Sequence, residues 1–141
     1  MAGYSGTPLV KKLGVKEGFR VGLLNPPDEF EMELSPLPNN VRITVSHLSK
    51  PLDLILLFVD SQKTLRREFP KAARKIAVHG MLWIAWPKKA SGVVTDLSDN
   101  SVRQIGLDAG LVDVKVCAVN DIWSGLKFVY RLQDRMSRHS D

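Results

Sequence analysis

The longest apolar segment of the chain covers residues 52–59 and contains a single charged residue. It is too short to span a bilayer, and its pattern is typical of a strand covered on both faces. Apolar residues then recur at helical spacing over residues 62–76, and a second apolar segment follows over residues 81–86. This order predicts a strand–helix–strand unit in which Leu54 and Met81 begin neighbouring parallel strands.

Details of this segment refine the prediction. Asp60 and Ser61 follow the first strand and have side chains that suit the N-terminal cap of the helix. Pro70 lies inside the helical pattern and lacks a backbone N–H, so we expect a kink or a restart near Phe69. Gly80 predicts the turn into the second strand.

Weaker patterns predict the flanking elements. They are a helix after Thr7, strands over residues 19–24 and 41–45, a short helix over 28–34, a helix over 96–109, and an antiparallel hairpin of strands over 112–118 and 126–132. Residues 133–141 are polar and are expected to be disordered. The predicted fold class is therefore α/β: one three-layer, Rossmann-like domain of residues 1–132, with a mostly parallel sheet and a C-terminal antiparallel hairpin.

Composition narrows the function classes only a little. A chain of 141 residues suits one domain, and Cys117 is the only cysteine, so neither a disulfide framework nor a thiolate metal cluster is expected. The N-terminus lacks a signal-peptide pattern, which indicates the cytoplasm. The net charge of +5 would favour nucleic acid, but the basic residues are spread along the chain. Nucleic acid is therefore expected to be an unlikely partner.

The order of the elements resembles a reduced class I S-adenosylmethionine-dependent methyltransferase fold, in which the last strand inserts antiparallel into the sheet. GFRVGLL resembles the first strand of such enzymes, LDLILLF resembles the fourth, and AVHGMLWIAW resembles the fifth. The resemblance covers about residues 7–132. It implies that one strand–helix unit of the usual fold is missing between Val45 and Leu54.

Two positions depart from what this resemblance implies for cofactor binding. The family has a glycine-rich turn after the first strand, whereas this chain has residues 25–28, Asn-Pro-Pro-Asp, in which proline restricts a close approach of the backbone. The family also has an acid at the end of the second strand, whereas this chain has Ser46 and His47. We therefore expect no cofactor, with S-adenosylmethionine as the alternative. Asn-Pro-Pro also resembles the catalytic motif of amino-directed methyltransferases, but that motif belongs after the fourth strand, where this chain has residues 59–61, Val-Asp-Ser.

A second resemblance spans nearly the whole chain. GYSGTPLVKKLG, WPKKASG and VCAVNDIWSGLKFV resemble a family of small bacterial proteins, a domain of unknown function. It implies no activity.

Ligands of open parallel sheets bind beyond the carboxyl ends of the strands. By this rule one crevice would be lined by Asn25, Asp28, Asp60, Ser61, Trp86, Lys88, Lys89 and Ser91. Helix capping, solvated charge and core packing are the alternative explanations for these residues. The segment of residues 86–92 is the best candidate, because an aromatic ring, two cations and a flexible glycine would suit an anion.

From these observations we expect a non-catalytic protein that binds a small anionic ligand or a protein partner on a degenerate methyltransferase-like scaffold. The alternatives are a divergent S-adenosylmethionine-dependent methyltransferase and a weak nucleic-acid binder. No catalytic residue is assigned. No metal site is expected, because His47, His79 and His139 are far apart along the chain and lack ligand-spaced neighbours. Trp123 is expected in a hairpin turn.

Overall fold

The computed structural model describes residues 7–49 and 51–139. Residues 3–6 of the segment GYSGTPLVKKLG and residues 140–141 of the predicted tail therefore lie outside the described part. Within the described residues, six strands form one sheet in the order β2-β1-β3-β4-β6-β5. The strands are β1 (Arg20–Leu24), β2 (Arg42–Val45), β3 (Leu52–Phe58), β4 (Ile76–Pro87), β5 (Leu111–Ala118) and β6 (Trp123–Tyr130). The first four pair in parallel, and β6 inserts antiparallel between β4 and β5, which confirms the predicted fold class.

The predicted central unit is present. Leu54 pairs with Met81 in parallel register, and helix α2 (Gln62–Ala73) connects β3 to β4. Ser61 caps α2, because its hydroxyl accepts a hydrogen bond of 3.1 Å from the backbone N–H of Thr64.

Three details of this unit differ from the prediction. Gly80 was expected at the turn into the second strand but lies within β4. Helix α2 continues through Pro70 to Ala73 with neither a break nor a restart near Phe69. Because the helix ends only three residues later, the missing N–H of Pro70 affects only its last turn. Ile76 was expected on the helical stripe but begins β4, where it pairs with Leu52.

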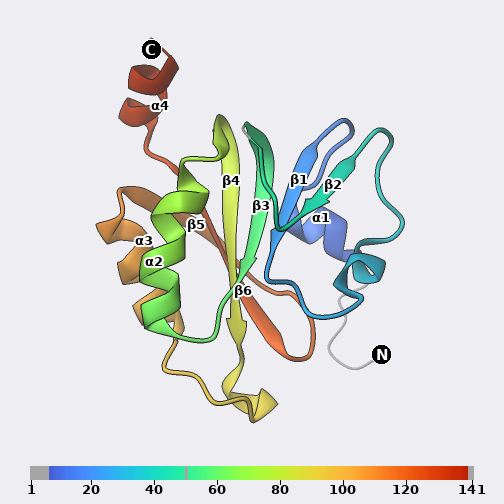
Figure 1. Ribbon diagram of the computed structural model, residues 1–141, viewed down its shortest axis with the longest axis vertical. Helices are drawn as coiled ribbons and strands as arrows, with labels where there is room; N and C mark the ends of the chain where they lie inside the picture. The colour runs from blue at the N-terminus through green and yellow to red at the C-terminus, as the bar shows by residue number, and fades with distance from the viewer. Residues whose placement is uncertain (1–6, 50, 140–141) are drawn as a thin grey trace.

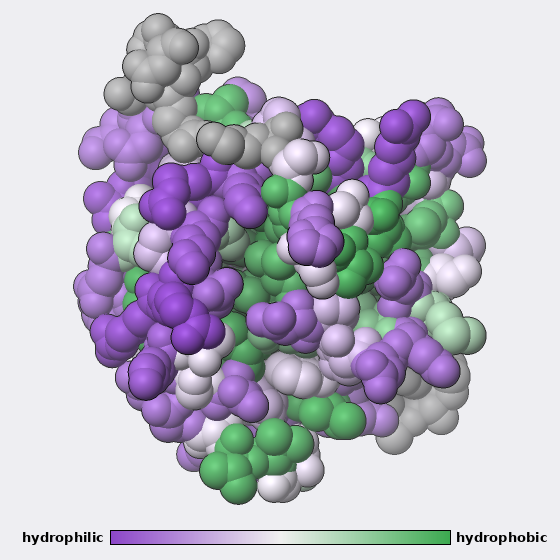
Figure 2. Space-filling model, in the orientation of Figure 1, coloured by the Kyte–Doolittle hydropathy of each residue, from purple (hydrophilic) through white to green (hydrophobic). Residues whose placement is uncertain are grey.

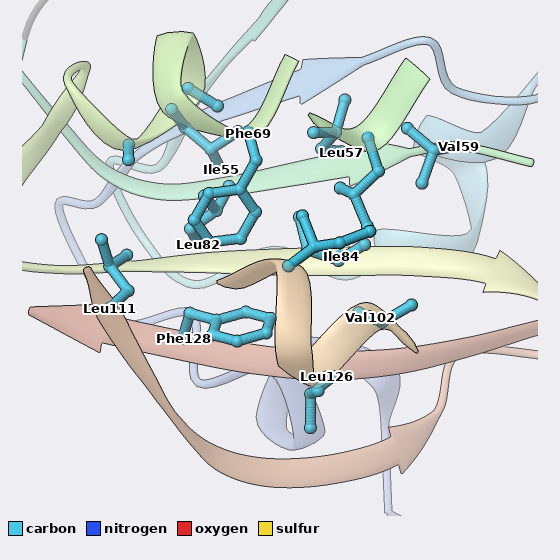
Figure 3. Packing of buried hydrophobic residues seen from close by; sticks show 14 of the residues in the cluster. Ile55, Leu57, Val59, Phe69, Leu82, Ile84, Val102, Leu111, Leu126 and Phe128 are labelled. Carbon is cyan, nitrogen blue, oxygen red and sulfur yellow. The ribbon is translucent and has the colours of Figure 1, made fainter. Parts of the chain in front are cut away.

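Helices cover the two faces of the sheet unequally (Figure 1). Helix α2 and helix α3 (Asp99–Asp108) pack on one face, which we call the front, and the short helix α1 (Leu9–Leu13) lies on the back with the 3-10 helix η1 (Phe30–Leu34). Figure 3 shows the front core, where Phe69 of α2 and Phe128 of β6 point toward one another. The buried residues form two clusters, one on each face.

One strand–helix unit of the usual methyltransferase fold is absent between β2 and β3. In the described residues no helix or strand separates them, so β2 is an edge strand and no helix covers β1 and β2 on the front face. Leu48, from the connecting loop, packs over Gly22 instead, where an added Cβ would lie only 2.9 Å from the Leu48 side chain. Hydrophobic surface is correspondingly visible in Figure 2 beside the hydrophilic surface of α2.

The C-terminal segment also differs from the prediction. Instead of a disordered tail from residue 133, the chain forms helix α4 (Leu132–His139). The start of α4 is attached to the end of β6, because the Arg135 Nε donates a hydrogen bond of 2.9 Å to the Tyr130 carbonyl. Among the described residues, no helix has the length and apolar character needed to cross a membrane.

Candidate functional site

A cavity of about 250 Å³ lies at the carboxyl ends of β1 and β3, and we call it the strand-end cavity. Its lining residues come from four separate parts of the chain: Asn25, Phe58, Val59, Asp60, Thr64 and Trp123. The described chain therefore assembles this site from the turn after β1, the end of β3, the start of α2 and the start of β6.

The position of the strand-end cavity follows from the sheet topology. The chain passes from β1 to β2 on one side and then returns to place β3 on the other side of β1. The connections that follow β1 and β3 therefore leave the sheet in opposite directions, which opens a crevice between their carboxyl ends. Such a switch point is where open α/β sheets bind their ligands.

Aromatic rings form one wall of the strand-end cavity. The Phe58 ring packs edge-on against Trp123, with ring centroids 5.0 Å apart, and against Phe30 of η1, with centroids 4.8 Å apart. Asn120 fixes Trp123 in place, because its side-chain oxygen accepts a hydrogen bond of 2.9 Å from the Trp123 backbone N–H. The Asn120 amide also donates to the Glu33 carboxylate at 3.0 Å, so the hairpin and η1 are joined beside the cavity.

Two polar side chains at the strand-end cavity have no hydrogen-bond or ion-pair partner among the described residues. Asn25 and Asp60 are both exposed; Asn25 directly follows half-buried Leu24 at the end of β1, and Asp60 follows buried Val59 after β3. The backbone at Asp60 is held in place, because its carbonyl accepts a hydrogen bond of 2.6 Å from the Thr95 hydroxyl. The Asn25 amide and the Asp60 carboxylate are therefore available to a ligand, and the backbone that carries the Asp60 carboxylate is held in place.

A second cavity, of about 330 Å³, lies at the carboxyl end of β4 and contains the other half of the predicted crevice. Trp86, Lys88 and Lys89 line this second cavity together with residues of α3, β5 and β6. The structure therefore divides the predicted crevice in two. Asn25 and Asp60 line one cavity, whereas Trp86 and the two lysines line the other.

Three predicted residues line neither of these two cavities. Ser61 is the N-terminal cap of α2, as already described. The Ser91 hydroxyl donates a hydrogen bond of 2.6 Å to the Lys88 carbonyl and accepts one of 3.2 Å from the Val93 N–H, which holds the loop after β4. Asp28 is exposed in the turn before η1.

Four lining residues of the strand-end cavity were missing from the predicted crevice. Phe58 and Val59 belong to the apolar strand and gave no polar signal, and Thr64 lies one helical turn after Ser61. Trp123 was expected in a hairpin turn but begins β6, opposite Pro87. No local pattern indicates that this hairpin returns to the end of β3, so its contribution could be found only from the folded chain.

A third and larger hollow of about 590 Å³ lies between η1 and β2, where exposed Met32 and Leu37 contribute to its lining. It lies away from the switch point, so we do not assign the site to it. Among the described residues no group of three or more histidine, cysteine, aspartate or glutamate side chains could hold a metal ion.

Four lysines gather on the back of the sheet, and we call Lys12, Lys16, Lys115 and Lys127 the back-face lysines. Burial lowers the pKa of the Lys127 ammonium below its ordinary value of 10.5, and Lys115 and Lys16 lower it further. Burial likewise raises the pKa of the Cys117 thiol, which Lys12 and Lys115 partly offset. A thiol with a raised pKa is mostly protonated near neutral pH, so Cys117 is a poor nucleophile.

Replacing Lys127 by glutamine should stabilise the protein at neutral pH by about 0.5 kcal/mol, a small gain because this side chain remains partly exposed. Since the folded-state pKa of Lys127 is lowered, the unfolded chain binds more protons in the window between that pKa and 10.5. Stability of the unsubstituted protein should therefore rise across this window, and the advantage of Lys127→Gln should fade toward pH 10.5. Urea unfolding from pH 7 to pH 10.5, with Lys63→Gln as the exposed control, tests this; equal curves for both variants would contradict it.

Comparisons with known proteins identify the fold. No protein-family model and no curated protein matches the sequence. Among solved structures, an S-adenosylmethionine-dependent methyltransferase from Aquifex aeolicus is 17% identical, with a TM-score of 0.59 over 85% of this chain and 86% of that one. A precorrin-6y C5,15-methyltransferase from Geobacter metallireducens is 10% identical, with a TM-score of 0.63 over 87% and 86% of the two chains. Aeropyrum pernix fibrillarin with natively bound S-adenosylmethionine is 15% identical, with a TM-score of 0.55 over 90% and 70%.

These matches correct two expectations from the sequence. A non-catalytic binding protein was expected, and no cofactor, but many of the similar structures are named as methyltransferases, and several contain S-adenosylmethionine or its demethylated product. They favour the alternative, a divergent methyltransferase. At these low identities it is the architecture that the comparisons establish: the chain has the fold of class I S-adenosylmethionine-dependent methyltransferases.

Proposed function

We propose that the protein is a divergent methyltransferase that binds S-adenosylmethionine in the strand-end cavity. The observation that supports this most directly is the position of the cavity. It lies at the switch point between β1 and β3, on a sheet with the methyltransferase arrangement, and Asn25 and Asp60 present polar groups there that have no partner among the described residues.

The turn after β1 fits a cofactor better than its two prolines suggested. Asn25 has a φ of 55°, in the left-handed region that glycine usually supplies, so the chain turns at Asn25 before the prolines begin. The Asn25 side chain can both donate and accept hydrogen bonds. It therefore suits the amino and carboxylate groups at the methionine end of S-adenosylmethionine.

The remaining walls also suit the chemistry of this cofactor. The sulfonium of S-adenosylmethionine is a cation, and cations are stabilised by aromatic faces and by carboxylates, which Phe58, Trp123 and Asp60 supply. One position fits less well, because exposed Ser46 and His47 follow β2 where the family has an acid. We therefore expect weaker cofactor binding than a carboxylate at that position would give.

When bound, the cofactor supplies a methyl group on a positively charged sulfur that a nitrogen or oxygen nucleophile can attack. Asp60 follows β3, the strand that matches the fourth strand of the family, so its carboxylate lies on the side expected for the acceptor. There it would accept a hydrogen bond from the acceptor N–H or O–H and take up the proton released on transfer. The apolar wall formed by Phe58 and Val59 would exclude water from the reacting atoms.

S-Adenosylmethionine and its demethylated product should both raise the thermal stability of the protein. A ligand that binds only the folded state stabilises it by about 2.7 kcal/mol at one hundred times its dissociation constant. Titration calorimetry should show that Asn25→Ala and Asp60→Ala each weaken binding of the demethylated product about tenfold, because each removes a polar contact worth about 1.4 kcal/mol.

Asp108→Ala is the matched control, because this exposed carboxylate lies at the end of α3 and lines neither the strand-end cavity nor the second cavity. It should leave the affinity unchanged. If neither compound changes the melting temperature at millimolar concentration, or if all three variants bind equally well, the proposed function is wrong.

The finer expectations from the sequence stand as proposals. We propose one domain of residues 1–132 that works in a bacterial cytoplasm, where the lone Cys117 would stay reduced. Membership of a small bacterial family rests on the segments GYSGTPLVKKLG, WPKKASG and VCAVNDIWSGLKFV. A small anionic ligand remains a separate proposal for the second cavity, because Lys88 and Lys89 line it.

A further inference from the structure

The back-face lysines form a compact cationic surface that draws on three parts of the fold. Lys12 lies in α1, Lys16 follows α1, and Lys115 and Lys127 lie on the paired strands β5 and β6. Lys115 and Lys127 are direct partners across the two strands, and both project from the back of the sheet. Like charges that face each other in this way destabilise a sheet, so their pairing calls for an explanation other than stability.

Contacts with backbone carbonyls hold two of these ammonium groups in place. The Lys12 Nζ donates a hydrogen bond of 3.1 Å to the Ala118 carbonyl, and the Lys115 Nζ donates one of 3.1 Å to the Lys12 carbonyl. These bonds join α1 to the edge strand β5. Each ammonium has three donors, so two donors of each remain for a bound anion.

Within residues 7–49 and 51–139, no carboxylate forms an ion pair with this surface. None of the ion pairs between described residues includes any of the back-face lysines, although Arg20, Arg67, Lys71 and Arg103 all have acidic partners. Burial lowers the pKa of Lys127 most, and the charges that lower it further are those of Lys115 and Lys16. The cluster therefore keeps its positive charge free for an external partner.

The shape of the surface favours an extended anion over a small enclosed one. Lys16 and Lys115 are exposed and Lys12 and Lys127 are half-buried, so all four side chains reach the surface of the back face. A chain of phosphates can contact several separated cations at once and release their counterions, whereas a single small anion on an open surface cannot. The net charge of +5 acts in the same direction.

We propose that the back-face lysines bind the phosphate backbone of a nucleic acid. The contacts are to phosphates and not to bases, so binding is independent of sequence and strongly dependent on salt. The surface reaches the hairpin that carries Trp123, because Lys12 contacts Ala118 and the next residue, Val119, donates to the Trp123 carbonyl at 2.9 Å. A bound strand would therefore lie on the same side as the aromatic wall of the strand-end cavity. The proposal does not depend on methyl transfer.

Fluorescence anisotropy with labelled 20-nucleotide probes tests this proposal. Single-stranded RNA, single-stranded DNA and duplex DNA of one sequence distinguish the kind of nucleic acid. For four phosphate contacts to a single strand, affinity should fall about 50-fold between 50 and 200 mM salt. The variant Lys115→Gln/Lys127→Gln should bind at least tenfold more weakly at 50 mM salt, and its salt dependence should be about half as steep.

The control variant Lys63→Gln/Arg74→Gln removes the same charge from exposed positions in and after α2. It should retain most of the affinity and the full salt dependence, and melting curves should show that both variants fold. Lys16→Gln, which changes an exposed side chain, gives a second and milder test. Three results would overturn the proposal: no binding at 50 mM salt, equal loss in both double variants, or equally tight binding of a polyglutamate peptide, which would indicate an acidic protein partner.

Discussion

Phe128→Ala should lower the free energy of unfolding by about 4 kcal/mol, among the largest effects of any single substitution in the chain. The Phe128 side chain is fully buried in the front core, and its ring lies edge-on to Phe69 of α2 with centroids 5.1 Å apart. Truncation would leave a cavity between α2, α3 and the sheet, which meet at this ring (Figure 3). Urea unfolding followed by tryptophan fluorescence measures the change.

Gly106 in α3 provides the matching test of this packing. A Cβ added at Gly106 would lie 2.1 Å from Cε2 of the Phe128 ring, so Gly106→Ala forces the helix and the ring apart. It should destabilise the protein by about 2 kcal/mol despite the better helix propensity of alanine. In the Phe128→Ala background the space is open, and the same substitution should stabilise by about 1 kcal/mol. Additive effects in this double-mutant cycle would show that α3 does not pack on Phe128 as described.

Much of the fold could be predicted because its strongest patterns are local. The apolar run of β3, the helical stripe of α2 and the apolar run that begins at Met81 each predict one element, and together they favour a parallel pairing. The missing unit between β2 and β3 could be inferred because too few residues separate the two strands. Boundaries were less predictable where tertiary contacts override local preference, as at Ile76, which pairs with Leu52 instead of extending α2.

The site was less predictable, because its parts meet only through sheet order. The rule that ligands bind beyond strand ends selected Asn25 and Asp60 correctly as neighbours, but it also grouped them with Trp86 and Lys88. Residues that follow β3 and β4 emerge at one edge of the sheet, yet the start of β6 lies between the two cavities and separates them: Trp123 lines one, and Ser124 lines the other. The alternation of side chains along β6 sends these two residues to opposite faces.

The expectation that proline would prevent cofactor binding was based on residue type and not on backbone conformation. Asn25 adopts the left-handed conformation itself, so the prolines follow the turn and do not form it. Asparagine tolerates this conformation better than most residues. A pattern of residue types therefore underestimated how closely this turn matches a glycine turn.

Trp83→Ala should destabilise the protein by about 4 kcal/mol, because Trp83 joins α1 to the back of the sheet. Its ring is fully buried, and the indole N–H donates a hydrogen bond of 2.9 Å to the Leu13 carbonyl at the end of α1. Trp83→Phe retains an aromatic ring but removes the donor, so it should destabilise by about 2 kcal/mol.

Trp86→Phe is the control for the loss of buried ring area without the loss of a hydrogen bond. Trp86 is also buried, but its indole makes no hydrogen bond with another described residue. It should be milder than Trp83→Phe. Because Lys12 belongs to α1, loosening this helix should also displace one of the back-face lysines. Hydrogen exchange should then be faster at Gly14 and Val15, whose N–H groups both bond to Val10, in Trp83→Phe than in Trp86→Phe. Equal exchange in the two variants would mean that the indole hydrogen bond does not hold α1 on the sheet.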